Sequence, residues 1–122
     1  MQLQPESHGG EYIIKSYQPG ALIVNDQRYD HSLIVGEKVL SPWRPQSLSA
    51  LNLEDWDAII SHSPELVIVG TGEALQFLEP SLLAPLYERK IGVEFMDTAA
   101  ACRTFTILVA EGRQVLAALL IK

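Results

Sequence analysis

The sequence predicts an α/β domain in which helices pack against a mixed β-sheet. Short apolar runs separated by turn residues fill roughly the first third of the chain, as in a meander of antiparallel strands. Farther along, apolar runs alternate with segments that carry helix caps and helical spacing. A β-meander followed by alternating helices and strands is typical of a mixed sheet covered by helices.

Length and composition indicate one core. A chain of 122 residues has the usual size of a single domain, and its 48% hydrophobic and 20% charged residues match an ordinary globular protein. Residues 1–10 are polar and contain Pro5 and the pair Gly9-Gly10, which favour a flexible tail. We therefore expect a flexible N-terminal tail at 1–10 and a single α/β domain at 11–122.

The predicted meander occupies residues 11–43. Its strands are separated by turn-forming sequences such as Gln-Pro-Gly at 18–20 and Asn-Asp at 25–26. The prolines at 42 and 45 disfavour helix in the residues that precede them and so close the section. The expected strands lie at 12–14, 21–24, 32–35 and 39–40.

A first helix is expected to begin after Asn52. Asn52 is a favourable N-cap, and Asp55 three residues later can complete a capping box. Leu51 and Trp56 occupy the two positions of a hydrophobic staple. Pro64 ends the helical pattern.

The middle of the chain predicts a buried strand and an irregular helical region. The run Leu-Val-Ile-Val at 66–69 lacks alternation, as expected for a strand covered on both faces, and we predict it as the central strand. It leads into the turn Gly-Thr-Gly at 70–72. In the following region, 73–90, Pro80 suits a helix start and Pro85 interrupts a continuous helix, so two short helices or one broken helix are expected.

The last part of the chain predicts a strand, a helix and a strand. Residues 91–96 form the first strand, and Asp97 and Thr98 cap a helix that Gly112 ends. Residues 115–121 then supply the final strand.

The alternative for this section is a β-hairpin with strands at 106–110 and 114–118. Its isoleucine, leucine and valine residues suit strands as well as helices. The alanine run at 99–101 favours the helix, because alanine is the best helix former.

Charge and leader signals limit the classes of partner. Nine Lys and Arg against fifteen Asp and Glu give a net charge of −6, which disfavours nucleic acid, and the cations are dispersed along the chain. The N-terminus lacks the basic and apolar parts of a secretory signal, and no apolar run approaches the roughly 20 residues of a membrane-spanning helix. We therefore expect a cytoplasmic chain that neither binds nucleic acid nor inserts into a membrane.

The turn at 70–72 resembles the start of a phosphate-binding turn. Glycines there would let backbone N–H groups converge on an anion at a helix N-terminus. The sequence lacks the Lys-Ser/Thr ending of a P-loop and the third glycine of a dinucleotide fingerprint, and Glu73 would place a negative charge at the phosphate position. The sequence therefore favours a tight turn that leaves a buried strand.

A second polar cluster lies where one strand ends and the next helix begins. Ligands of open α/β sheets bind at such strand ends, and five residues gather there: Glu94, Asp97, Thr98, Cys102 and Arg103. Arg103 and the helix start could lower the pKa of the Cys102 thiol, although a lone cysteine among alanines is more often a small buried apolar residue. Asp97 and Thr98 likewise have a sufficient role as a helix cap.

No metal, cofactor or catalytic site is predicted. His8, His31 and His62 show no ligand spacing between any pair, and no Gly-x-Ser-x-Gly nucleophile elbow occurs. Cys102 is the only cysteine, so neither an intramolecular disulfide nor a thiolate cluster can form within the chain.

Four segments, taken in order, carry a family resemblance. They are PELVIVGTG at 64–72, IGVEFMDT at 91–98, AACRT at 100–104 and AEGR at 110–113. The chain resembles the family of unknown-function domains that includes the adipogenesis-associated Mth domain proteins and mitochondrial respiratory complex I assembly factor 3. The tyrosine-containing meander and Trp43 before the first helix also fit, so the likeness covers nearly the whole chain.

The resemblance implies a compact three-layer α/β fold around a mixed sheet with one strand antiparallel to the others. It also implies no established enzymatic activity, because the eukaryotic members look like assembly or regulatory factors. Family members often carry Tyr-Asn where this chain has Phe105-Thr106. The polar positions that the resemblance marks as shared are Thr71, Asp97, Thr98, Arg103 and Thr104.

Two functional hypotheses follow. The first is a non-enzymatic interaction or assembly protein with a protein partner, linked by resemblance to respiratory complex assembly. The alternative is a protein or enzyme that binds a small anionic ligand in a pocket between the 70–72 turn and the helix start at 97–103. The candidate ligand- or partner-binding residues are Gly70, Thr71, Gly72, Asp97, Thr98, Cys102, Arg103 and Thr104.

Overall fold

The computed structural model describes residues 11–122 as two sheets with helices, and the flexible tail expected at 1–10 lies outside this range. Three strands form one sheet and five form the other. In chain order the elements, with η marking 3₁₀ helices, are β1 (Ile14–Gln18), β2 (Ala21–Val24), β3 (Gln27–Tyr29), β4 (Leu33–Val35), β5 (Leu40–Pro42), η2 (Leu48–Ala50), η3 (Leu53–Trp56), α1 (Asp57–Ile60), β6 (Leu66–Thr71), η4 (Pro80–Leu83), α2 (Ala84–Glu88), β7 (Gly92–Met96), α3 (Thr98–Ala110) and β8 (Val115–Leu120).

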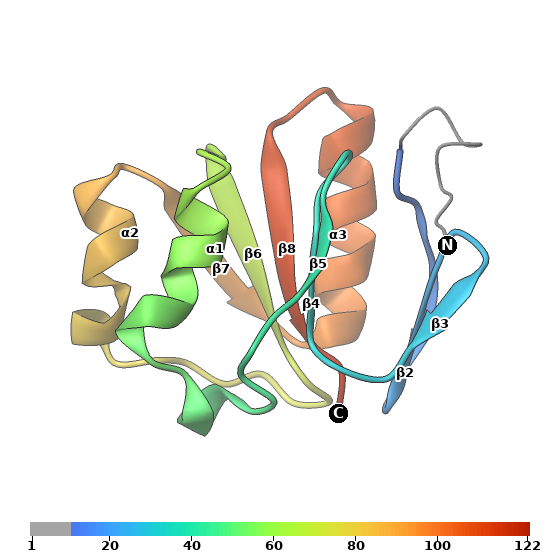
Figure 1. Ribbon diagram of the computed structural model, residues 1–122, viewed down its shortest axis with the longest axis horizontal. Helices are drawn as coiled ribbons and strands as arrows, with labels where there is room; N and C mark the ends of the chain where they lie inside the picture. Colours follow the sequence, from blue (N-terminus) through green and yellow to red (C-terminus); the bar gives the residue numbers. More distant parts are fainter. Residues whose placement is uncertain (1–10) are drawn as a thin grey trace.

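The elements form three layers. Figure 1 shows the five-stranded sheet in the middle, with α1 and α2 on one side and α3 with the β1–β3 sheet on the other. This arrangement confirms the compact α/β fold that the element order and the resemblance predicted. It also leaves α3 and β1 side by side in one outer layer.

The five-stranded sheet is mixed, with strand order β5-β4-β8-β6-β7. β4 is antiparallel to both of its neighbours, whereas β6, β7 and β8 are parallel, so one strand runs against the other four, as predicted. The run 66–69 lies inside the sheet as β6, but β8 is the middle strand, and the prediction of 66–69 as the central strand is wrong. Both strands are unbroken apolar runs, and hydrophobicity alone does not rank two strands that are each buried on both faces.

The final strand divides the core into two halves. Leu116, Ala118 and Leu120 point to the side of α1 and α2, whereas Ala117 and Leu119 point to the side of α3. This is the period-two alternation of a β-strand, here with apolar side chains on both faces. Each outer layer therefore packs on its own apolar cluster.

The predicted meander is present but is shared between two sheets. β1, β2 and β3 pair antiparallel as a separate sheet, whereas β4 and β5 join the main sheet. β3 was not expected, because its sequence Gln-Arg-Tyr contains no apolar run. It is held by pairing with β2, in which Ile23 lies opposite Arg28.

The helix expected after Asn52 is confirmed as η3 followed directly by α1. The backbone N–H of Asn52 donates to Asp55 Oδ2 at 2.7 Å, which is one half of the predicted capping box. Trp56 is fully buried. The local sequence is sufficient here, because every partner lies within four residues.

The segment 98–110 is a helix and not a strand of a hairpin. The side chain of Asp97 accepts a hydrogen bond from the Ala100 N–H at 2.9 Å and caps the helix. Gly112 follows with φ +82°, the left-handed conformation that commonly ends helices. The helical region expected at 73–90 begins only at Pro80, and residues 72–79 form a loop.

Candidate functional site

Thr98 joins three elements at the carboxyl edge of the main sheet. Its side chain is completely buried. Thr98 Oγ1 donates to the Leu120 carbonyl at 2.7 Å and accepts from the Gly72 N–H at 2.8 Å. The Thr98 N–H donates in turn to the Gly72 carbonyl at 2.9 Å. We call Gly72, Thr98 and Leu120 the Thr98 junction.

The two glycines of the 70–72 turn fit this junction closely. A Cβ atom at Gly70 would lie 2.9 Å from Thr98 Oγ1 and 3.0 Å from a methyl carbon of Leu119. Gly72 has φ +94°, which side chains with a Cβ rarely adopt. The turn therefore brings β6 against the start of α3, and its backbone groups at Gly72 bond to Thr98.

Thr71 fixes the loop that leaves this turn. Its buried hydroxyl donates to the Ala74 carbonyl at 2.7 Å and accepts from the Gln76 N–H at 3.1 Å. These two hydrogen bonds hold the first half of the loop 72–79 in a defined conformation. We call the whole of residues 72–79 the 72–79 loop.

The 72–79 loop presents apolar side chains to solvent. Leu75 is 50% exposed and Phe77 is 73% exposed, the largest exposure among the big hydrophobic residues of the described range. The Phe77 ring lies 6.2 Å from the ring of Phe95 on β7, measured between centroids. Exposed apolar side chains on an ordered loop mark an interaction surface more often than isolated ones do.

The remaining predicted site residues lie along α3. Asp97 caps the helix, Arg103 is exposed, and Thr104 is half-buried. Cys102 is buried at 8% exposure. The turn 70–72 and the helix start do meet, and at this meeting Thr71, Asp97 and Thr98 each bond to backbone groups of the protein.

A groove lies between α3 and β1. Its volume is about 460 Å³, and four consecutive residues of β1, Ile14 to Tyr17, form one wall. Cys102, Arg103 and Ile107 are part of the opposite wall on α3. We call it the β1–α3 groove.

Burial sets the chemistry of Cys102. Removal from water raises the pKa of its thiol to about 12, and this effect outweighs the lowering by the neighbouring Arg103. The thiol is therefore neutral near pH 7, and Cys102 contributes an apolar surface rather than a nucleophile.

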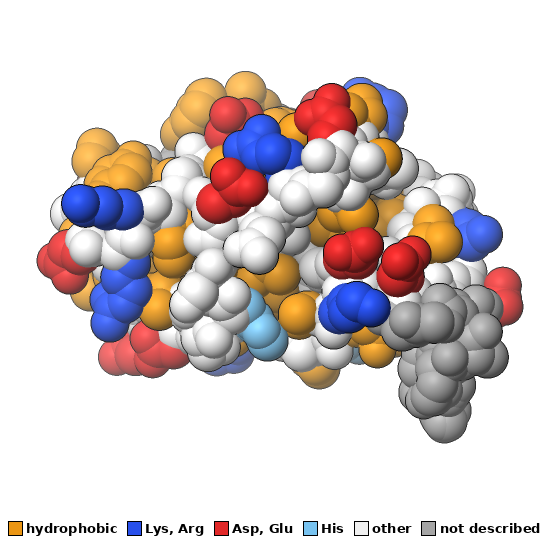
Figure 2. Space-filling view, turned by 90° about the horizontal axis from the view of Figure 1, so that it is seen from above, with side chains coloured by type: hydrophobic (Ala, Val, Ile, Leu, Met, Phe, Trp, Pro, Cys, Tyr) orange, Lys and Arg blue, Asp and Glu red, His pale blue; other side chains and the backbone are white. Residues whose placement is uncertain are grey.

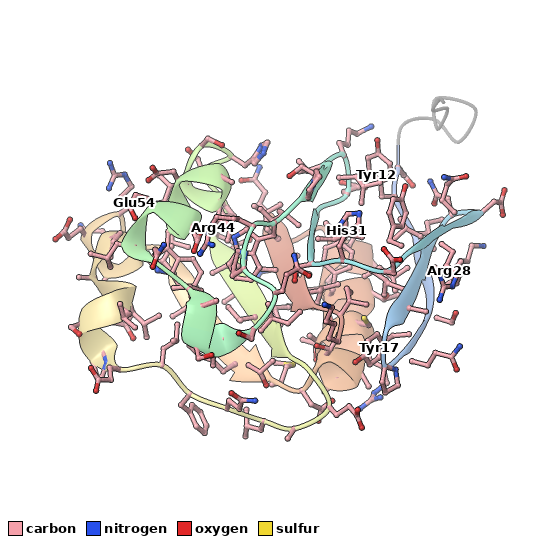
Figure 3. The ribbon with its side chains drawn as sticks, turned by 60° about the horizontal axis from the view of Figure 1, so that its bottom comes forward. Tyr12, Tyr17, Arg28, His31, Arg44 and Glu54 are labelled. Carbon is pink, nitrogen blue, oxygen red and sulfur yellow. The ribbon has the colours of Figure 1, made fainter. Side chains whose placement is uncertain are left out.

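Tyr17 is a polar residue of the groove that the sequence did not single out. Its hydroxyl donates to the Ile121 carbonyl at 3.2 Å, and Figure 3 shows it beside α3. Burial, and then the charge of Glu73, raise the pKa of this phenol. Only the position of β1 next to α3 reveals Tyr17, since 85 residues of sequence separate it from Cys102.

Charged side chains of the described residues do not gather into one patch on the face seen in Figure 2. Lys and Arg side chains are scattered there among Asp and Glu. Within residues 11–122 no three His, Cys, Asp or Glu side chains gather where they could hold a metal ion. The longest helix of that range, α3, has 13 residues, and none of the helices there has the length and hydropathy to cross a bilayer.

Comparison with solved structures defines the class of protein. A crystal structure from Bordetella parapertussis matches with a TM-score of 0.87 and 34% identity, covering 93% of this chain and 98% of that one. A solution structure from Bordetella pertussis, described as a Mth938-like domain, matches with a TM-score of 0.82 and 27% identity over 99% of this chain and 92% of that one. The fold is that of the Mth938-like domains.

The chain belongs to the family described as protein of unknown function (DUF498/DUF598), whose sequence profile matches residues 14–120. This confirms the predicted resemblance. NADH dehydrogenase [ubiquinone] 1 alpha subcomplex assembly factor 3 of Xenopus tropicalis is 34% identical over 94% of this chain. The chain spans 64% of the length of that relative, slightly less than two thirds.

A second relative carries a different kind of name. The 13 kDa major membrane protein of Francisella tularensis is 30% identical over 94% of this chain and 95% of its own length. The relatives of this chain thus include proteins named as assembly factors and one named as a membrane protein.

Proposed function

We propose that the chain is a protein-binding module with an assembly-type role and that the 72–79 loop contacts the partner. The observation that carries this proposal is the exposure of Phe77 at 73% on a loop that buried hydrogen bonds of Thr71 hold in place. Aromatic side chains, phenylalanine among them, are enriched at the cores of protein–protein interfaces. The names of the assembly-factor relatives support the same role.

The loop suits a protein partner better than a small ligand. The polar groups beside it, on Thr71, Asp97 and Thr98, are already bonded to backbone atoms of the chain. Leu75 and Phe77 project outward and do not line the groove on α3. An exposed apolar surface of this kind suits another macromolecule rather than a buried small molecule.

The relatives' names suggest which partner to test first. Because the Xenopus relative is named as an assembly factor of NADH dehydrogenase, we infer that the partner is a subunit of such a complex. The experiment is affinity capture of the tagged chain from native cells, followed by calorimetry with the purified partner. Wild type, Phe77→Ser and Leu53→Ser are compared.

Phe77→Ser should weaken partner binding about thirtyfold, which corresponds to an interface residue worth about 2 kcal/mol. Leu53→Ser is the matched control, because Leu53 is also a large apolar side chain at 47% exposure but lies on η3. Equal binding by wild type and Phe77→Ser would overturn the proposed surface. Sustained turnover of a small substrate by the purified chain would argue against the non-enzymatic role.

A further inference from the structure

The β1–α3 groove has walls from two elements far apart in sequence. The wall from α3 runs from Ala99 to Ile107, a length of about 12 Å at the helical rise. The groove volume of about 460 Å³ falls in the range typical of small-molecule sites. None of its lining residues belongs to the 72–79 loop, although the charge of Glu73 on that loop reaches Tyr17, so a function here is additional to the proposed protein binding.

The charged side chains that line this groove are positive, whereas the chain as a whole is negative. The lining includes two cations, Lys15 on β1 and Arg103 on α3, and no Asp or Glu, and the carboxylates whose charges raise the pKa of Tyr17, Glu73 and Asp97, lie outside this lining. The chain as a whole carries a net charge of −6. Neither cation forms a salt bridge within residues 11–122, where Arg44 and Arg113 both do. Two cations on facing walls therefore provide a local attraction for one anionic group.

Most of the remaining lining is apolar. Ile14, Ala99 and Ile107 contribute hydrocarbon, and Cys102 adds its neutral thiol. Ile107 is 58% exposed, although it is a large apolar residue in the middle of a well-formed helix. An apolar ligand body lying along α3 would cover this side chain and remove its surface from water.

We propose that the β1–α3 groove binds a small amphipathic carboxylate. Its head group bonds to Lys15 and Arg103 from the two walls, and its aliphatic body packs along Cys102 and Ile107. A free aliphatic acid satisfies both halves of the groove, whereas a neutral alcohol lacks the charge and a small inorganic anion lacks the apolar body.

The test is a titration of ¹⁵N-labelled protein with octanoate, followed by NMR of the backbone amides. We expect saturable shifts at Lys15, Ser16, Arg103, Thr106 and Ile107. The parallel titrations use 1-octanol, which has the same chain without the charge, and inorganic phosphate, which has charge without the chain. Both should bind about tenfold more weakly than octanoate.

Substitutions test the cationic half and the apolar half of the groove separately. Arg103→Gln should weaken octanoate about tenfold and leave 1-octanol unchanged, and Lys15→Gln gives a second reading of the same effect. Ile107→Gln should weaken both ligands. Arg89→Gln is the matched control, since Arg89 is an exposed cation at the end of α2 and should have no effect.

Several outcomes would overturn the proposal. They are the absence of saturable shifts on β1 and α3, equal affinities for octanoate and 1-octanol, and equal affinities for octanoate and phosphate. Phe77→Ser should bind octanoate like wild type. The proposal for the groove and the proposal for the 72–79 loop can therefore be tested independently.

Discussion

Two regions of the molecule place arginine beside apolar surface and use it in opposite ways. In the corner between the meander and α1, Arg44 donates to both carboxylate oxygens of Asp55, each at 2.7 Å, and to the Ala50 carbonyl. In the β1–α3 groove, Lys15 and Arg103 have no carboxylate partner among the described residues. Figure 3 shows Arg44 beside the helical segments on the opposite side of the sheet from Tyr17.

The comparison shows how a partner within the fold changes the role of a charged side chain. Asp55 is buried at 8% exposure, and its carboxylate also accepts the Asn52 N–H, so the ion pair is part of the helix start. This pair with its hydrogen bonds stabilises the native chain. An exposed cation without a partner contributes little to folding but remains able to bind an anion from solution.

The largest effect is expected for Asp55→Ala. The substitution removes the carboxylate that accepts from the Asn52 N–H and from Arg44, and we expect it to lower the free energy of unfolding by about 3 kcal/mol. Urea unfolding followed by circular dichroism measures this loss. Asp57→Ala, two residues along and exposed, is the control and should change stability by less than about 0.5 kcal/mol. A loss below about 1 kcal/mol for Asp55→Ala would remove the contrast between the two regions.

Thr98→Val tests what determines the loss of stability when a polar side chain of α3 is replaced. We expect it to depend on the hydrogen-bond partners within the protein and not on the helix that carries the residue. Thr98 begins the same helix that carries Arg103, but its hydroxyl bonds to Gly72 and Leu120. The variant leaves a buried N–H and a buried carbonyl without that partner and should cost about 2 kcal/mol. Thr98→Ser keeps the hydroxyl and should recover most of the loss. Faster hydrogen exchange of the Gly72 amide in Thr98→Val, but not in Thr98→Ser, would locate the effect.

Lowering the pH should reduce the contribution of the Arg44–Asp55 pair to the stability of the protein. Hydrogen bonds from Arg44, with a further one from the Asn52 backbone, hold the pKa of Asp55 below its ordinary 3.8 although burial opposes this. The contribution of the carboxylate is therefore complete above about pH 5 and is lost as the pH falls through the lowered pKa. Wild type should exceed Asp55→Asn by about 1–2 kcal/mol near neutral pH, and this difference should shrink below about pH 3. A difference that stays constant into acid would mean that the charge of Asp55 does not contribute.

The same two regions show how far the sequence alone can predict structure. The start of η3 could be predicted because Asn52, Asp55 and Trp56 lie within one helical turn. The bond from Arg44 to Asp55 spans 11 residues and crosses a loop, and no local pattern indicates it. The mixed sheet with packed helices followed from the order of elements, and the three layers followed from the family resemblance. The strand order did not follow, because two buried strands have the same pattern.

The β1–α3 groove shows more clearly which features cannot be predicted from the sequence. Local signals placed Cys102 and Arg103 on one helix, and their role in binding stays a prediction. The facing wall, with Lys15 and Tyr17, comes from an edge strand at the opposite end of the chain. The sequence predicted a strand at 12–14, whereas β1 runs from Ile14 to Gln18, so Lys15 and Tyr17 lay outside the predicted strand. The packing of β1 beside α3 depends on the tertiary fold.

The smallest effect on stability is expected for Lys15→Gln and Arg103→Gln. Both side chains are exposed and form no salt bridge in the described range, so each variant should unfold within about 0.5 kcal/mol of wild type. Urea unfolding of the two variants and of the double variant measures this directly. A loss above about 1 kcal/mol would show that these cations serve the fold, as Arg44 does through Asp55. Unchanged stability together with weakened octanoate binding would show how the two regions differ. Arg44 pairs with a carboxylate of the protein, Asp55, whereas Lys15 and Arg103 bind an anion from solution.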